Sequence, residues 1–334
     1  MAWENRGQVR RSTRSLSQKA ASLADTQQDE NLAAATAQAL ISHPSISLLP
    51  ASSNLSPKST GLKTRDLALL QQKQRLLNAS TPLALASLIE PHLQSPLRAT
   101  LVFAQKEAGT AFCISATGLL LTCSHCVSET PEELKSNRTK FLLFASGRVV
   151  KARCIKYDEV RDLALMQIIA AESTTPSLTT ITKSQETSWT TFPFINISSI
   201  PPKLNARMMC IGHPGDEDLE CTTPGKKTGY DVLHMSFGKY RGIAEDADVQ
   251  DNSEIGALMH DCWTYWGHSG APLCLAKDGG LVGMHSSWDD ETGMRRGVAW
   301  EAIVAFLEQE GNPHIATTRD VLTEGSSERP ILLG

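Results

Sequence analysis

Residues 109–127 read GTAFCISATGLLLTCSHCV, and the interpretation of the whole chain starts from this stretch. It holds two short apolar runs that are separated by small polar residues and Gly118. Short apolar runs bounded by turn-forming residues are typical of buried strands. The second run leads directly to His125, at a point where a rigid strand would present a side chain at its rim. The stretch therefore predicts two neighbouring strands with a candidate functional histidine at their end.

Similar apolar runs recur on both sides of this stretch. Between about residues 97 and 170 the runs are LRATLVF, GTAFCIS, LLLTCSH, KFLLFAS, RVVKARCIKY and LALMQI. A polar connection at about 171–205 is followed, up to about residue 300, by ARMMCIG, VLHMSFGKY, GALMHDC, APLCLA, LVGMHSSW and RRGVAW. Two consecutive sets of six short strands predict an all-β fold of two six-stranded antiparallel β-barrels, because closure of a sheet removes its exposed edges.

The segment before the strands divides into two parts. Residues 1–62 are rich in Ser, Ala, Gln, Thr and Asn and show no structural period, which predicts a disordered leader. Residues 63–96 contain TRDLALLQQKQRLL, whose leucines share one face of a short helical segment that we expect to pack near the core. We expect Pro82, Pro91 and Pro96 to break any continuation of that helix.

The segment after the strands predicts one helix and a tail. Residues 301–310 carry apolar residues at helical spacing. Residues 313–334 are polar and predict a loose tail. The strands and the helix together define one domain over residues 97–312, with the first barrel at about 97–170 and the second at about 205–300.

Composition and charge exclude several classes of function. The net charge of −4 gives no reason to expect nucleic acid as a partner. No run approaches the roughly 18 apolar residues that a transmembrane helix needs, and the start lacks the apolar stretch of a secretory signal. We therefore expect an intracellular protein, in the cytoplasm or nucleus rather than secreted. The basic, serine-containing start predicts a disordered tail, with a mitochondrial transit peptide as the alternative. The sequence leaves the oligomeric state open.

The eight cysteines, without a secretory signal, predict free thiols in a reducing compartment. Cys123 and Cys126 form a C-x-x-C pattern around the candidate histidine. A redox motif of the thioredoxin type would need a βαβ context, and a structural zinc site would need a second pair at matching spacing. Neither context is present in the sequence, so we expect these thiols to be ordinary and no metal to be bound.

A candidate nucleophile lies in the second set of strands, in the run GHSGAP that begins at Gly267. Glycines on both sides of Ser269 allow a tight turn that presents one hydroxyl group outward. The amides of Gly267 and Ser269 can then converge on one point and stabilise a developing oxyanion. The alternative interpretation is a polar turn between two strands.

A serine nucleophile needs a base, and the base needs an orienting acid. His125 is the candidate base, with a hydrogen-bonded structural histidine as the alternative. Asp162 directly precedes the apolar run LALMQI, where an acid is either a cap or a buried acceptor for an imidazole N–H. Asp158 and Glu159 are rivals that lie further from the apolar run.

Three segments, GTAFCISATGLLLTCSHCV, RDLALMQI and GHSGAPL, resemble the catalytic motifs of the trypsin-like (chymotrypsin-fold) serine peptidases, and most of all those of the HtrA-like branch. Their order, His before Asp before Ser, is the chymotrypsin order and differs from that of subtilisins and α/β-hydrolases. CIGHPGD and RRGVAWEAIVAFL extend the resemblance, which covers roughly residues 97–310.

The resemblance implies a two-barrel fold with the active site in the cleft between the barrels, and cofactor-free endopeptidase activity on polypeptides. It implies that His125 is the general base, Asp162 its orienting acid and Ser269 the nucleophile, with the Gly267 and Ser269 amides as oxyanion hole. The residues that it places around the substrate are Trp263, Thr264, Tyr265 and Trp266, beside the primary specificity pocket, and His285, Ser286 and Ser287, on the strand that pairs with the substrate backbone. Because the first group is aromatic and holds no acid, we predict an apolar rather than a Lys/Arg preference.

Some features depart from the family pattern. His268 stands where relatives usually carry Asp or Asn, and Ala271 replaces a glycine, but neither change removes an amide. No trypsin-type activation sequence precedes the first strand, and the residues after Glu310 leave no room for a PDZ domain. The main alternative function is a protease-fold binding module that has lost catalysis, and a hydrolase for non-peptide esters is the third. The intact His, Asp and Ser favour the peptidase.

Overall fold

The structure is a computed structural model that describes residues 46–105, 109–173, 191–219 and 221–309. All of these residues belong to one compact unit, residues 43–334. The predicted leader over residues 1–45, most of the predicted polar connection and the predicted tail after residue 309 lie outside the described residues. Within the described residues, no helix is long and apolar enough to cross a membrane.

The first barrel contains the first set of predicted strands. Its strands are β2 (Thr100–Phe103), β3 (Thr110–Cys113), β4 (Leu119–Thr122), β5 (Thr139–Phe144), β6 (Val149–Asp158) and β7 (Leu163–Glu172). They pair in the order β7-β4-β3-β2-β5-β6, and the β6–β7 pairing closes the ring. Nearly every residue of β2 to β5 is buried, which explains the continuous apolar runs in the sequence.

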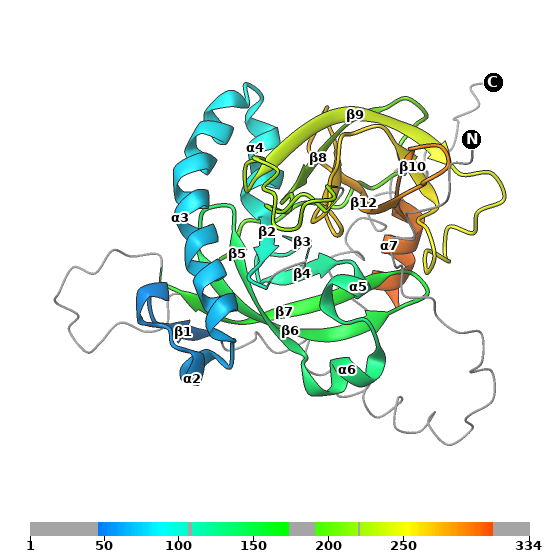
Figure 1. Cartoon of the computed structure of the whole chain (residues 1–334). Helices are drawn as coiled ribbons and strands as arrows, with labels where there is room; N and C mark the ends of the chain where they lie inside the picture. Colours follow the sequence, from blue (N-terminus) through cyan, green and yellow to red (C-terminus); the bar gives the residue numbers. More distant parts are fainter. Residues whose placement is uncertain (1–45, 106–108, 174–190, 220, 310–334) are drawn as a thin grey trace, which may run out of the picture. The chain divides into compact units, whose positions relative to one another are not determined.

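The second barrel contains the second set. Its strands are β8 (Arg207–Gly212), β9 (His234–Ile243), β10 (Leu258–His260), β11 (Pro272–Leu275), β12 (Leu281–Trp288) and β13 (Arg295–Ala299). They close in the order β10-β13-β12-β11-β8-β9. The prediction of two six-stranded antiparallel barrels is confirmed, and all twelve predicted runs contain an observed strand. Figure 1 shows the two barrels one above the other, with the first barrel in teal and green and the second running from green (β8) through yellow to orange.

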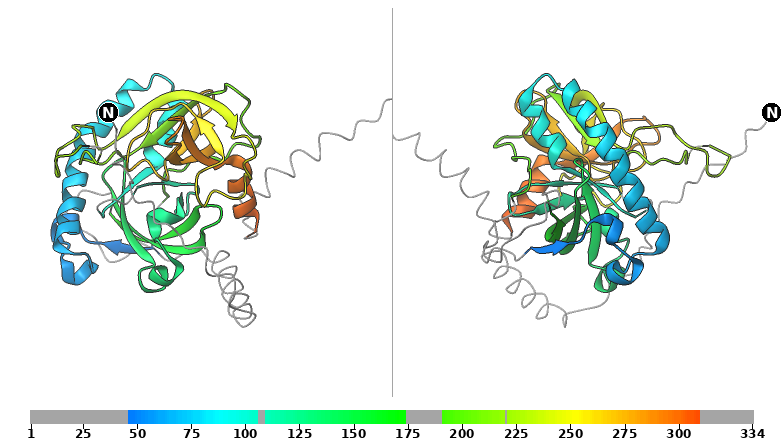
Figure 2. Two further views of the ribbon diagram at one scale, coloured as in Figure 1. Left: turned by 45° about the vertical axis from the view of Figure 1, so that its right-hand side comes forward. Right: turned by 90° about the vertical axis from the view of Figure 1, so that its left-hand side faces the viewer.

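Helices cover the junction between the barrels, and one more helix follows the last strand. The long helix α3 (Thr64–Ser87) is followed by α4 (Pro91–Ala99), and both pack on a core cluster that also holds residues of β2, β5 and β8. Figure 2 shows α3 running across the face where the barrels meet. The short helices α5 (Ser124–Val127) and α6 (Pro131–Ser136) follow β4, and α7 (Trp300–Glu308) is the predicted carboxyl-terminal helix.

The prediction that the prolines break the leader helix was wrong for Pro82 and Pro96, because α3 continues through Pro82 to Ser87 and Pro96 lies inside α4. A proline inside a helix removes one backbone hydrogen bond. Contacts with the first barrel offset that loss: Leu77 is fully buried, and the Thr81 hydroxyl donates to the Ala145 carbonyl. Pro91, in contrast, occupies the first turn of α4, where a missing N–H costs nothing.

The predicted disorder of the leader is also wrong for its last part. Residues 46–62 form β1 (Ser47–Leu49), a 3₁₀ turn (Ser52–Asn54) and α2 (Pro57–Thr60). Strand β1 pairs in parallel with residues 170–172 of β7, which extend beyond the residues that pair with β4. An unpaired strand edge is a site for strand addition, so the fold of the first barrel itself orders this segment.

Candidate active site

His125 lies on the one-turn helix α5, immediately after the buried strand β4. Its side chain is 48% exposed, and its Nδ1 lies 3.0 Å from each carboxylate oxygen of Asp162. Asp162 comes from the turn between β6 and β7 and has a left-handed backbone conformation, with φ of 52°. Aspartate tolerates this conformation better than most residues, so the turn can aim its carboxylate at α5. The structure thus brings together two residues that are 37 positions apart.

The Asp162 carboxylate is buried and receives several hydrogen bonds. Besides the imidazole, the Ser124 hydroxyl donates to Oδ1 at 2.9 Å and the His125 amide donates to the same oxygen at 3.3 Å. Burial alone would raise the pKa of this carboxyl group, but the His125 charge and these donors outweigh it and lower the pKa. Asp162 is therefore ionised, as an orienting acid must be.

The same contact acts on the imidazole in the opposite sense. Partial desolvation lowers the pKa of His125, but the negative charge of Asp162, with a contribution from Cys126, outweighs it and raises the pKa well above the usual value. In the neutral ring, Asp162 also fixes the tautomer, because Nδ1 donates to the carboxylate and Nε2 is left as the acceptor. The rival acid Asp158 pairs with Arg161 at 2.7 Å.

Ser269 lies in a tight turn that contacts both barrels. Gly267 and Gly270 have positive φ angles of 98° and 85°, and a Cβ on Gly270 would lie 2.0 Å from the Thr110 carbonyl oxygen. Only glycine permits both that conformation and that approach. The Thr110 amide of β3 donates to the Ser269 carbonyl at 2.8 Å, so the first barrel holds this turn of the second barrel directly.

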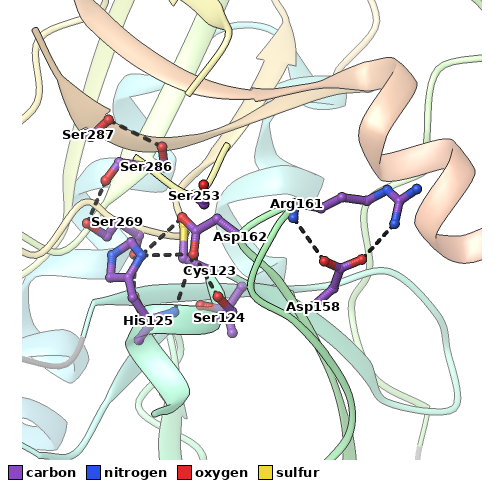
Figure 3. Close-up of polar contacts among 12 residues, drawn as sticks. Cys123, Ser124, His125, Asp158, Arg161, Asp162, Ser253, Ser269, Ser286 and Ser287 are labelled. Carbon is purple, nitrogen blue, oxygen red and sulfur yellow. Dashed lines mark hydrogen bonds and ion pairs between the residues drawn. The ribbon is translucent and has the colours of Figure 1, made fainter. Parts of the chain in front are cut away.

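The Ser269 hydroxyl points beside the imidazole rather than at it. Its Oγ donates to the Ser286 carbonyl of β12 at 3.0 Å, as Figure 3 shows, and within the residues that the structure describes no hydrogen bond joins it to His125. The amides of Gly267 and Ser269, the predicted oxyanion hole, have no hydrogen-bond acceptor among these residues. The Gly267 carbonyl points away, since it accepts from the Thr110 hydroxyl at 2.8 Å.

The four residues predicted to line the specificity pocket differ in burial and in the side chains that they contact. The rings of Trp263 and Tyr265 are stacked with centroids 6.3 Å apart, and both contact Tyr230 edge to face. Thr264 is buried, with a hydroxyl that has no partner in the described part of the chain. Trp266 is 37% exposed and packs edge to face on Trp288. That these side chains select the substrate stays a prediction.

On the side of the second barrel, buried histidines lie next to the candidate active site. His285, at the start of the predicted substrate strand, lies with its Nδ1 3.1 Å from His260 Nε2. His268, beside the candidate nucleophile, places its Nδ1 3.2 Å from the Tyr265 amide. Burial lowers the pKa of His260 and of His268 to about 3, so both rings are neutral. His268, which stands where relatives usually carry Asp or Asn, is thus a neutral residue that needs no ionic partner.

Sequence reasoning gave no role to Ser124 or to the two cysteines of α5 and its N-cap. Ser124 holds the acid, and its position next to His125 was the one available signal. The Cys126 thiol donates to the Ser269 carbonyl at 3.4 Å, and the Cys123 thiol donates to the His285 carbonyl at 3.6 Å. Cys123, His125 and Asp162 place possible metal-ligand atoms within 4.8 Å of one another, but the imidazole and the carboxylate are already bonded to each other.

Comparisons with known proteins give likenesses in structure and in sequence. The Ser→Ala mutant of Rv3671c from M. tuberculosis H37Rv in its inactive form is 15% identical, with a TM-score of 0.45, over 68% of this chain and 93% of that chain. The inactive form of the Rv3671c protease is 16% identical, with a TM-score of 0.44, over 66% and 93%. The HtrA-type protease AlgW with a decapeptide is 16% identical, with a TM-score of 0.41, over 61% and 51%.

The search of curated proteins gave no match. The family model described as "Trypsin-like peptidase domain" matches residues 109–284, which is more than half of the chain. The match includes His125, Asp162 and Ser269.

Proposed function

The chain belongs to the trypsin-like peptidase domain family, and we propose that it is an active serine endopeptidase with the triad His125, Asp162 and Ser269. The observation that carries the proposal is the hydrogen-bonded His125–Asp162 pair, which lies beside a glycine-flanked turn that presents Ser269. A base held by a buried acid next to a presented hydroxyl is the arrangement that nucleophilic catalysis by serine requires.

In the proposed acylation step, the Ser269 oxygen attacks the carbonyl carbon of the scissile peptide bond. His125 Nε2 takes the hydroxyl proton, and the Asp162 carboxylate stabilises the imidazolium that forms. The free amides of Gly267 and Ser269 donate to the oxyanion of the tetrahedral intermediate. The carbon–nitrogen bond then breaks, and the imidazolium gives its proton to the leaving amine.

In the proposed deacylation step, a water molecule takes the place of the leaving amine. His125 removes a proton from the water as it attacks the acyl carbon. The second tetrahedral intermediate then collapses: the bond between the acyl carbon and the Ser269 oxygen breaks, and the imidazolium gives its proton to that oxygen. Each proton is given back within one cycle, so the imidazole and the serine hydroxyl are both restored.

The substrate backbone is proposed to pair with the end of β12. Strand β11 pairs with β12 as far as Met284, and the backbone of Gly270 and Ala271 then bonds to His285. In the described part of the chain, one edge of residues 286–288 therefore has no strand beside it. An extended peptide can add to such an edge as a further strand. The aromatic stretch that begins at Trp263 supports an apolar preference at the cut site. A peptide-library cleavage profile dominated by Lys or Arg at that position would contradict this preference.

The rival function is a binding module of the protease fold, and one contact favours it. The Ser269 hydroxyl donates to the Ser286 carbonyl and not to the base. In the active enzyme, a rotation about the Cα–Cβ bond of Ser269 must redirect this hydroxyl toward His125 Nε2. In the binding module, the present contact would be the permanent one.

Labelling by a fluorophosphonate probe separates the two functions, because the probe reacts only with an activated serine. We expect the wild-type protein to be labelled, and the Ser269→Ala and His125→Ala variants not to be. Circular dichroism of all three proteins provides the control for folding. A folded wild-type protein that resists labelling would assign the chain to the binding module.

A further inference from the structure

A cavity of about 170 Å³ lies beside the turn that carries Ser269. Its walls come from α3, from the end of β2, from Gly109, from the segment after β8 and from Gly267. Gly267 is also one of the two proposed oxyanion donors, so the cavity begins where the reacting carbonyl would sit. None of its lining residues belongs to β12.

The position of the cavity shows which side of the scissile bond it faces. A peptide that pairs with the end of β12 reaches the Ser269 hydroxyl from that strand, whose Ser286 carbonyl that hydroxyl contacts. Beyond the scissile bond, the peptide must leave β12 behind and pass Gly267 and Gly109. Gly109 lies against the Ser269 carbonyl, since a Cβ there would be 2.2 Å from that oxygen. The cavity therefore lies on the side of the leaving group.

The walls of the cavity expose large apolar side chains. Four of the twelve large hydrophobic side chains that are exposed in the described chain line it. These are Leu76 (46% exposed), Leu219 (48%), Tyr230 (44%) and Trp266 (37%). Exposed apolar side chains that converge on one hollow mark a binding site. An apolar cavity of about 150 Å³ accommodates a benzene ring, so this one has room for a single Leu, Met or Phe side chain.

One wall of the cavity comes from outside the part of the chain that matches the family model, because helix α3 precedes residue 109. This helix contributes Leu69, Gln72, Lys73 and Leu76. Its position is fixed by Lys73, whose amine donates to the carbonyls of Phe103 at 2.6 Å and Gln105 at 3.2 Å at the end of β2. The wall is therefore tied to the strand end that leads to Gly109.

We propose that this cavity is a binding site for one apolar side chain on the leaving-group side of the substrate, and that α3 is a specificity element of the enzyme. The inference rests on the proposed function, because it assigns the cavity to one side of the bond that Ser269 would cleave. The segment before the family domain then selects substrates as well as packing on the core.

The test uses leucinamide, which mimics an amine product that carries an apolar side chain. Tryptophan fluorescence of the full-length Ser269→Ala protein is titrated with leucinamide and with alaninamide, since Trp266 lines the cavity. We expect saturable binding that is about tenfold tighter for leucinamide. Leu76→Asp and Leu219→Asp, on opposite walls, should abolish the difference, whereas the matched control Leu83→Asp, on α3 but outside the cavity, should retain it.

Binding does not depend on catalysis, so failure of the two proposals can be told apart. Equal binding of the two amides, or a leucinamide preference that survives both cavity variants, would overturn the assignment of the cavity. Absence of fluorophosphonate labelling with leucinamide binding intact would overturn only the proposed activity. In the active enzyme, the cleavage profile should show Leu, Met or Phe enriched within three positions after the cut, and Leu76→Asp should remove this enrichment.

A second inference comes from the two cysteines around His125. Cys123 is the N-cap of α5 and Cys126 lies one turn later, with its amide donating to the Cys123 carbonyl at 3.2 Å. Residues three apart on a helical turn have Cβ atoms about 5–6 Å from each other. A disulfide holds them at about 3.5–4.5 Å, so the turn must tighten for the bond to form. The Cys123 side chain contributes most to lowering the pKa of Cys126 to about 6. Cys126 is partly exposed, and Cys123 is buried behind it.

We infer that Cys126 is a site of oxidation by peroxides and that Cys123 is its resolving partner. The Cys126 thiolate attacks one peroxide oxygen, the oxygen–oxygen bond breaks, and the sulfur becomes a sulfenic acid as hydroxide leaves. The Cys123 sulfur then attacks the sulfenic sulfur, the sulfur–oxygen bond breaks, and water leaves with the Cys123 proton. The disulfide removes the thiol hydrogen bonds to the Ser269 and His285 carbonyls, so the nucleophile turn and β12 both lose a contact.

The test treats the full-length protein with hydrogen peroxide and maps its thiols by mass spectrometry. We expect a Cys123–Cys126 disulfide that dithiothreitol reverses, and fluorophosphonate labelling that slows about tenfold on oxidation. In Cys123→Ser, dimedone should trap the sulfenic acid on Cys126. Cys221→Ser removes the other partly exposed thiol and serves as the matched control. Absence of the disulfide, or equal peroxide sensitivity in Cys126→Ser, would overturn the inference, and the mass readout is independent of activity.

Discussion

The histidines of the two barrels occupy opposite environments. In the first barrel, His125 is half exposed and bonded to an ionised carboxylate, which raises its pKa. In the second barrel, His213, His260 and His268 are buried, and burial lowers their pKa to about 3. The comparison teaches that the buried acid, and not the two-barrel fold as such, prepares an imidazole to take up a proton.

The two environments also give opposite dependences of stability on pH. The raised pKa of His125 stabilises the fold fully below its unfolded value near 6.5, and this contribution is lost as the pH rises through the folded pKa. The lowered pKa values of the buried histidines act in the other direction. Below pH 6.5 these histidines are protonated in the unfolded chain but remain neutral in the folded chain. The free energy of unfolding therefore decreases as the pH is lowered from about 6.5 to about 3.

The largest effect on activity should come from removing His125, the half-exposed histidine of the first barrel. His125→Ala leaves Ser269 without a base, and we expect kcat/KM to fall by about 10³-fold or more. The measurement is the rate of fluorophosphonate labelling or of peptide cleavage. His260→Ala, which removes a buried histidine, is the contrast. A variant that lost activity only in proportion to its folded fraction would mark His260 as structural. An active His125→Ala protein would refute the assignment of the base.

The next effect should come from removing the acid that makes the two environments different. Asp162→Asn should lower kcat/KM by about 10²- to 10⁴-fold, because the imidazole loses its orientation and its stabilised charge. Loss of the negative charge also lowers the pKa of His125, so the acid limb of the pH–rate profile should move to lower pH. Asp158→Asn, which disturbs only the Arg161 pair, is the matched control. An unshifted acid limb would show that Asp162 does not set the titration.

The buried histidines should give a smaller effect, on stability. At pH 5, one neutral histidine with a pKa of about 3 costs the fold about 2 kcal/mol relative to pH 7. Urea unfolding of His213→Gln should therefore show a pH 7 to pH 5 loss about 2 kcal/mol smaller than that of the wild type. A His213→Gln protein with the full wild-type loss would contradict a neutral, buried ring.

The smallest effect should come from the partner of the acid. Ser124→Ala removes the hydroxyl that donates to Asp162 at 2.9 Å, and we expect kcat/KM to fall about tenfold. Ser128→Ala is the control, since that hydroxyl contacts Thr130 and Glu133 in the same segment. Equal effects of the two substitutions would mean that Ser124 supports the fold of the segment and not the acid.

The barrels and the chemical pattern of the site could be predicted because they depend on local sequence. Each buried strand is a continuous apolar run ended by turn residues, and the glycines around Ser269 report a turn that other residues cannot form. The pairing of His125 with Asp162 was predicted from chain order and from the apolar run that follows the acid. Both signals lie within a few residues of the group that they concern.

The features that escaped prediction depend on tertiary contacts. Helix α3 passes Pro82 because Thr81 and Leu77 are held by the first barrel, and no local pattern encodes that support. Strand β1 forms because β7 is longer than its partner β4, a property of pairing and not of either segment alone. The orientation of the Ser269 hydroxyl depends on the Ser286 carbonyl, 17 residues away, and cannot be read from the nucleophile motif.

The hydrogen bond from the Thr110 amide to the Ser269 carbonyl also bears on how the chain is made. During synthesis, the first barrel emerges from the ribosome with the proposed base and acid, but without the proposed nucleophile. The serine arrives much later and is seated only when its turn docks on the finished strand β3. Under the proposed function, a nascent or truncated chain that lacks Ser269 therefore cannot cleave peptide bonds.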